Sequence, residues 1–188
     1  MEGRRKRFVI PVYQRNYNWK YEQCKQLFDD LVALSRNGKS SHFFGSIVSV
    51  NDNSKEYTII DGQQRLTTVS LIMIAMIKSV ENGVFDNEGD KKICANIKQD
   101  YIVADDDDVN KLRLRPYNDD KDAFNRIVFD TEDKYNEASN VTVNFRYFYD
   151  RLVKERELSL ADLIDAIEKL QIISIELKPE QGDDPQLI

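Results

Sequence analysis

Residues 61–68 of the chain read DGQQRLTT, and they contain the change from a strand-like sequence to a helix-like one. Before them, residues 56–60 are rich in β-branched and aromatic side chains, which favours a strand. From Gln64, inside this stretch, residues 64–80 carry apolar side chains on more than one side of a helical pattern, which is typical of a buried helix. Asp61 and Gly62 interrupt the strand, so the stretch predicts a strand, a tight turn and a central helix in succession.

Further strands are predicted on both sides of this unit. Residues 43–50 are β-rich, and the polar residues 51–54 favour a turn that would make them a hairpin with residues 56–60. A short strand is expected at residues 8–10. It should end before Pro11, because proline has no backbone N–H to donate to a neighbouring strand. Two more strands are expected at residues 112–116 and 172–177, and an aromatic-rich loop at residues 12–19.

Other helices are predicted where apolar residues recur at helical spacing. They cover residues 20–37, 91–101, 119–129, 140–154 and 160–170. The acidic run 105–108 is expected to be an exposed turn. These elements predict an α+β fold, with a small mixed sheet, a buried central helix and additional C-terminal helices.

Composition limits the possible functions. The net charge is −6 without a basic stripe, which argues against a dedicated duplex-DNA binder. The basic run at residues 4–7 is interpreted as a solvated terminal arm. The apolar stretch 69–77 is shorter than the ~20 residues that cross a bilayer. Cys24 and Cys94 predict reduced core thiols and therefore a cytoplasmic protein.

The turn at residues 61–65 is predicted to hold an anion. The first N–H groups of a helix lack internal partners, and the macrodipole favours phosphate there. Gly62 would let the backbone approach closely, and Arg65 can grip phosphate oxygens in a bidentate way. Gln63 and Gln64 offer donors and acceptors, and Asp61 could hold a divalent cation. The alternative is that Asp61 only caps the helix and Arg65 pairs with it.

The loop before the first long helix is a second candidate. Its aromatic residues alternate with polar and cationic ones, and their rings could stack on a nucleobase. The rings in question are those of Tyr13, Tyr17 and Trp19. The alternative is that they pack onto the following helix and cover the core, which is expected for at least one of them.

Three motifs occur in order along the chain: IPxYQRxYxW at residues 10–19, FGSI at 44–47 and DGQQRLTT at 61–68. Together they resemble the DGQQR-motif family, which includes the N-terminal half of GmrSD-type, modification-dependent restriction enzymes and sensor proteins of phosphorothioation-based defence. That family resembles the ParB and sulfiredoxin superfamily in fold. The resemblance covers roughly residues 8–188 and is strongest before Thr68.

The resemblance implies a domain that binds and hydrolyses a nucleoside triphosphate with a divalent cation, expected to be Mg²⁺, and couples hydrolysis to DNA restriction. The catalytic candidates are Asp61, Gln63, Gln64 and Arg65, with Asp61 also the metal ligand. The phosphate-binding candidates are Arg15, Gln14, Gly62, Arg65, Thr67 and Thr68. The base-stacking candidates are Tyr13, Tyr17 and Trp19.

Residues 1–188 are expected to be a single truncated N-terminal domain, because the chain ends abruptly on apolar residues, and a C-terminal effector would then be absent. DNA would be contacted through that missing region or through a partner nuclease. One alternative is a ParB-like module that binds DNA or senses modified DNA without hydrolysis. Another is a purely structural interaction domain.

Other chemistries are excluded by missing residues. The run Gly38-Lys39-Ser40 imitates the end of a P-loop, but Ala33 stands where its first glycine is required. With His42 as the single histidine and no paired cysteines, neither an HNH nuclease nor a zinc site can be assembled. The turn also lacks the reactive cysteine of sulfiredoxin-like reductases.

Overall fold

The structure is a computed structural model that describes residues 6–37, 40–53, 55–104, 112–129, 132–155 and 158–185. Its centre is a five-stranded sheet in the order β4-β1-β3-β2-β5. The strands are β1 (Arg7–Ile10), β2 (His42–Asn53), β3 (Glu56–Asp61), β4 (Leu114–Pro116) and β5 (Leu170–Leu177). β1 is parallel to β3 and β4, whereas β2 is antiparallel to β3 and parallel to β5. The predicted mixed sheet is therefore confirmed.

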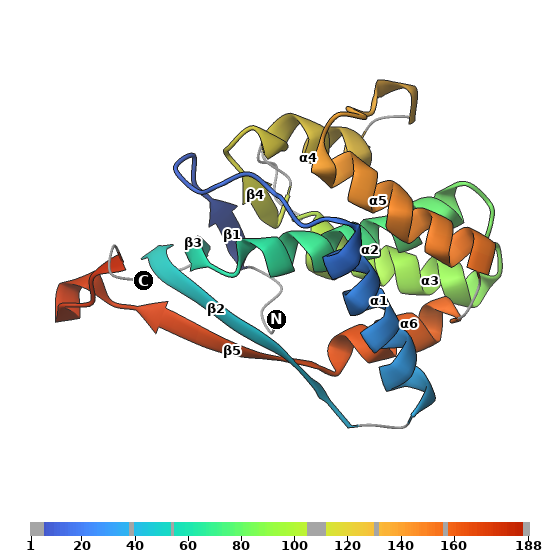
Figure 1. The fold of residues 1–188 in the computed structure, drawn as a ribbon, viewed down its shortest axis with the longest axis horizontal. Coiled ribbons are helices and arrows are strands. Elements are labelled where there is room, and N and C mark those ends of the chain that lie inside the picture. The colour runs from blue at the N-terminus through green and yellow to red at the C-terminus, as the bar shows by residue number, and fades with distance from the viewer. Residues whose placement is uncertain are drawn as a thin grey trace.

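The helices gather on one side of the sheet, with α2 in the middle of them (Figure 1). In the described parts of the chain they are α1 (Tyr21–Arg36), α2 (Gln63–Glu81), α3 (Glu88–Ile97), α4 (Asp120–Phe129), α5 (Asn140–Asp150) and α6 (Leu160–Glu168). α3 and α5 each continue into a π-helical turn, at Lys98–Ile102 and Arg151–Glu155. Short 3-10 turns cover Glu132–Lys134 and Pro179–Gln181.

The central helix α2 is buried along most of its length, as predicted. Leu71, Ile72, Met73 and Ile74 are each at most 3% exposed, and successive residues of a helix point about 100° apart, so α2 is buried on all sides there. A helix that is apolar on all sides is stable only inside a core, and α3 and α5 pack against α2. None of the described helices is long and apolar enough to cross a membrane.

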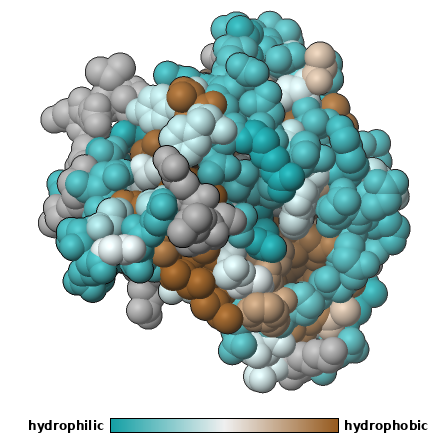
Figure 2. All heavy atoms as spheres, turned by 60° about the vertical axis from the view of Figure 1, so that its left-hand side comes forward, coloured by the Kyte–Doolittle hydropathy of each residue, from teal (hydrophilic) through white to brown (hydrophobic). Residues whose placement is uncertain are grey.

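The outer strand β5 is only partly covered. Leu170 and Ile172 line a cavity with residues of α2, whereas the side chains of Ile173 and Ile175 are 54% and 42% exposed. This alternation follows from the period of two in a strand. The face shown in Figure 2 is mostly hydrophilic, and its hydrophobic residues gather mainly in the lower half of the view.

The edge strand β4 is more buried than its alternating sequence predicts, since all its residues are buried. Arg115 is tolerated there because its Nη1 donates to Glu56 Oε1 at 3.0 Å. A buried guanidinium needs such a partner. Of the basic run 4–7, which was expected to be a solvated arm, Arg4 and Arg5 lie outside the described residues, whereas Arg7 is buried in β1 and Lys6 lies over the ring of Tyr57.

Most predicted elements appear with shifted ends. β2 continues through Asn53, so the hairpin turn begins later than residues 51–54, and the ladder is irregular between Asn51 and Asn53. The acidic run 105–108 lies outside the described residues. Cys24 and Cys94 are buried free thiols, as predicted, and burial raises the pKa of Cys24 to about 11 and of Cys94 to about 12.

Candidate functional site

The DGQQR turn joins β3 to α2 without a side-chain cap. β3 ends at Asp61, and Gly62 is the N-cap of α2 with φ +94° and no side-chain hydrogen bond to the helix. Asp61 therefore does not cap the helix, but the ion pair that the same alternative expected between Arg65 and Asp61 is present. A Cβ on Gly62 would lie 2.9 Å from both Ser46 O and Ile47 Cγ1. The missing side chain of Gly62 therefore lets β2 approach the turn closely. The sequence prediction expected a ligand to use this space.

One side of the Arg65 guanidinium contacts β2, and the side chain is partly exposed to solvent. Its guanidinium lies across Gly45, where a Cβ would be 2.8 Å from Arg65 Nε. Arg65 Nη1 donates to Ser46 O at 3.2 Å and lies 4.0 Å from Asp61 Oδ2. The Arg65 side chain is 34% exposed and lines a cavity of about 130 Å³ between α2, β2 and β5. A cationic group in the first turn of α2 thus borders a cavity that runs along the side of the helix to Met73 and is otherwise lined mostly by apolar side chains, with Glu168 among them.

Gln64 holds the preceding loop. It is 5% exposed, and its Nε2 donates to Asn16 O at 3.2 Å. Its Oε1 accepts from the N–H of Asn18 at 2.9 Å. Both ends of the amide are thus bonded to the backbone of the aromatic-rich loop. This arrangement gives Gln64 a structural role that the motif alone did not reveal.

Gln63 and Gln14 form a bridge beside the turn. Gln63 Nε2 donates to Gln14 Oε1 at 3.0 Å, and Gln14 Nε2 donates to Ile60 O at 2.8 Å. The Oε1 atom of Gln63 accepts no hydrogen bond from the described residues. Gln63 therefore keeps an acceptor for water or substrate, although its side chain is largely buried.

Tyr17 is an anchor of the loop rather than an exposed ring. It is 3% exposed, and its pKa lies well above the ordinary value because of burial. Thr68 Oγ1 donates to the carbonyl of Gln64, so the Tyr17 hydroxyl donates to Thr68 at 2.8 Å. Asn144 Nδ2 donates to the same hydroxyl at 3.2 Å. The core-packing alternative holds for Tyr17, and the buried side chains of Thr67 and Thr68 are withdrawn from any phosphate in this conformation.

The other loop candidates are more accessible. Tyr13 is 72% exposed. Arg15 is also exposed, and its side chain makes no hydrogen bond or ion pair with the described part of the chain. Trp19 is half-buried against the core and lines a groove with His42. Tyr13, Arg15 and Trp19 therefore remain available to a ligand.

The loop is also held by two residues that the sequence prediction missed. Asp120, at the start of α4, accepts from the N–H of Tyr17 at 2.6 Å, and burial raises the pKa of this carboxyl. Asn144 Nδ2 also donates to Trp19 O at 2.8 Å. A usable signal was present for Asn144, since it is a polar residue on the apolar face that includes Val141 and Phe145. Asp120 offered no comparable signal.

Asp61 is the candidate metal ligand, and its side chain is 54% exposed. Within the described ranges, no group of three or more histidine, cysteine, aspartate or glutamate residues could hold an ion. A single carboxylate still suits Mg²⁺, which is usually bound through one or two carboxylates together with substrate phosphates and water. Asp61 therefore fits an ion that arrives with a nucleotide.

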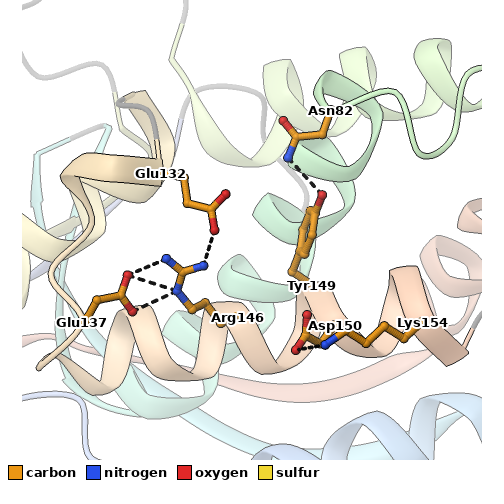
Figure 3. Close-up of polar contacts among 7 residues, drawn as sticks. All are labelled: Asn82, Glu132, Glu137, Arg146, Tyr149, Asp150 and Lys154. Atoms are coloured by element: carbon orange, nitrogen blue, oxygen red, sulfur yellow. Dashed lines mark hydrogen bonds and ion pairs between the residues drawn. The ribbon is translucent and has the colours of Figure 1, made fainter.

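A cleft of about 350 Å³ at the other end of α2 is the rival site. Figure 3 shows five of the residues that line it, Asn82, Glu132, Arg146, Tyr149 and Asp150, together with Glu137 and Lys154, to which two of them are paired. Arg146 is held by both Glu132 and Glu137, which raise its pKa. Because its arginine is already neutralised by two carboxylates, this cleft is a poor anion site. The DGQQR turn therefore remains the predicted anion site.

The comparisons agree with the motif pattern. The chain matches, over residues 1–187, the family model described as "GmrSD restriction endonuclease, N-terminal domain". A search of curated proteins gives no match.

Proposed function

The chain belongs to the family of GmrSD restriction endonuclease N-terminal domains, and we propose that it binds and hydrolyses a nucleoside triphosphate at the DGQQR turn. Hydrolysis would control DNA restriction by a nuclease domain or a partner. The observation that carries the proposal is the position of Arg65 in the first turn of α2, where its partly exposed guanidinium lines a cavity. Helix N-termini and arginine forks are both suited to phosphate.

Five residues of the site have roles in this proposal. Arg65 and Arg15 neutralise the phosphates. Asp61 holds the divalent cation, which supplies charge stabilisation to the phosphates when bound. Gln63 positions the attacking water through its unbonded Oε1. Gln64 keeps the loop that carries Arg15 next to the turn.

The proposal is tested by measuring nucleotide affinity and phosphate release with Mg²⁺ for the wild type and Arg65→Ala. A bidentate, charge-assisted contact is worth about 1.5–3 kcal/mol, so affinity should fall roughly 10- to 150-fold. Arg126→Ala is the matched control, because it removes the same charge from an ion pair on α4. Equal affinity of wild type and Arg65→Ala would remove the basis of the proposal. DNA retention without phosphate release would instead support the non-hydrolysing, ParB-like alternative.

A further inference from the structure

The residues that follow β4 lie beside the aromatic-rich loop. β4 runs parallel to β1, with Pro116 opposite Ile10, and Tyr117 N donates to Ile10 O at 2.8 Å. Parallel neighbours end at the same edge of a sheet, so the segments that leave β1 and β4 continue side by side. Residues 118–120, which read NDD, therefore reach the loop at residues 15–17, although 103 positions separate the bonded residues in the chain.

Asp120 makes the strongest contact between this 118–120 segment and the loop. Its Oδ2 accepts from the N–H of Tyr17 at 2.6 Å, and both residues are buried. Hydrogen bonds to a carboxylate are about twice as strong as neutral ones. Asp120 is itself held by Asn118, whose Oδ1 accepts from Asp120 N at 3.2 Å. The main chain of the loop is therefore fixed at Tyr17.

Two exposed contacts extend this attachment to the two residues before Tyr17. Asn118 Nδ2 donates to Arg15 O at 3.3 Å, and Asp119 Oδ2 accepts from Asn16 Nδ2 at 3.0 Å. Three successive residues of the 118–120 segment thus hold three successive residues of the loop. Exposed hydrogen bonds are weaker than buried ones, so these two contacts mainly set the direction in which the loop runs.

The later part of the loop is held by a different element, α5. Asn140 Nδ2 donates to Tyr17 O at 3.2 Å, and Asn144 Nδ2 donates to Trp19 O at 2.8 Å. Among the described residues, Asn118 is the only one that bonds to the main chain of Arg15. The 118–120 segment therefore acts on the part of the loop that carries Arg15.

We propose that the 118–120 segment positions Arg15 for the phosphates of the nucleotide. The inference rests on the nucleotide site proposed at the DGQQR turn. The Arg15 side chain is unbonded within the described part of the chain, whereas its main chain is held. A main chain that is fixed in advance lowers the entropy lost when the guanidinium meets a phosphate. Asp120 is thus a positioning residue that acts through Arg15.

The test is a double-mutant cycle on nucleotide affinity. ATP, GTP, CTP and UTP are titrated with Mg²⁺ by calorimetry, and the one that binds most tightly is used for all variants. Arg15→Ala should lower the affinity about tenfold, the effect of one hydrogen bond to a charged group. Asp120→Ala should lower it about three- to tenfold in the wild-type background but less than about twofold in the Arg15→Ala background, because the two residues act as one unit.

Stability measurements separate this effect from a structural one. Asp120→Ala leaves a buried N–H without its acceptor, so it should lower the urea midpoint alike in both backgrounds. Asp120→Asn keeps an oxygen acceptor and should restore most of the affinity. Asp122→Ala is the matched control, because it removes another carboxylate from the first turn of α4, one that pairs with Arg126 on the same helix. It should bind the nucleotide as the wild type does.

The outcomes distinguish the inference from the proposed function. An equal loss of affinity from Asp120→Ala in both backgrounds would mean a general loosening of the loop and would overturn the inference, as would an unchanged affinity in Asp120→Ala. If Arg15→Ala binds like the wild type while Arg65→Ala binds more weakly, the inference fails and the nucleotide site stands. If none of the four nucleotides binds, both the proposed function and the inference fail.

Discussion

The position of Gln64 makes a prediction that separates structure from catalysis. Gln64→Met keeps a long, unbranched side chain with good helix propensity, so the packing and the helix should survive. What is lost are the two hydrogen bonds to the loop, from Gln64 Nε2 to Asn16 O and from Asn18 N to Gln64 Oε1. We therefore expect the loop to loosen and the domain to lose stability.

The magnitude follows from these two bonds. Each contributes about 0.5–1.5 kcal/mol net, so the free energy of unfolding should fall by about 1–3 kcal/mol. For a domain of this size, 1 kcal/mol corresponds to about 2–4 °C in Tm, and the variant should melt about 2–12 °C lower. A substitution of exposed Gln26 by methionine on α1 should change stability by less than about 0.5 kcal/mol.

Urea unfolding measures the effect directly. The midpoint should shift at an unchanged m-value, which identifies a true loss of stability. A Gln64→Met protein that is as stable as the wild type but releases no phosphate would contradict the structural role of Gln64 in holding the loop, and it would favour direct catalysis by Gln64. Lower stability together with weaker nucleotide binding would agree with a role of Gln64 in holding the loop.

Two further predictions concern other parts of the molecule. Gly45→Ala adds a Cβ 2.8 Å from Arg65 Nε at φ +113°, so it should cost about 1–3 kcal/mol in urea unfolding and also weaken nucleotide binding. Unchanged values would show that Arg65 does not depend on Gly45. At pH 8 the raised pKa of about 11 for Cys24 leaves about one thiol in a thousand ionised. Alkylation of the native protein should therefore be slow at both cysteines, and rapid labelling would mean that the core opens.

Most elements of this fold were predictable because their own residues carry the burial pattern, although β4 is more buried than its alternating sequence indicates. The apolar faces of residues 20–37 and 64–80 correspond to α1 and α2, and the β-rich runs correspond to β2 and β3. The strand order is a different matter. The neighbours β2 and β5 are separated by several helices in the chain, and no local periodicity records that contact.

The sequence predicts where the candidate site residues gather but not how their side chains are oriented. The motif places these candidates at adjacent positions of one helix, and such positions point in different directions, about 100° apart. Arg65 therefore borders a cavity, whereas Gln64 is bonded to the loop. Tyr17 is held by Asp120, which accepts from its backbone N–H, and by Asn144, which donates to its hydroxyl, and both residues are more than a hundred positions away in the chain. Only the three-dimensional structure shows such a partner.

The two glycine-containing motifs at residues 44–47 and 61–65 act as one unit. Gly45 leaves the space that the Arg65 guanidinium occupies, and Gly62 leaves the space that Ser46 and Ile47 occupy. A Cβ at either position would collide with the other motif, and both glycines have φ values that other residues rarely adopt. This reciprocal packing fixes Arg65 before any ligand arrives. In the proposed binding of phosphate, less side-chain entropy would then be lost at Arg65, which would favour affinity.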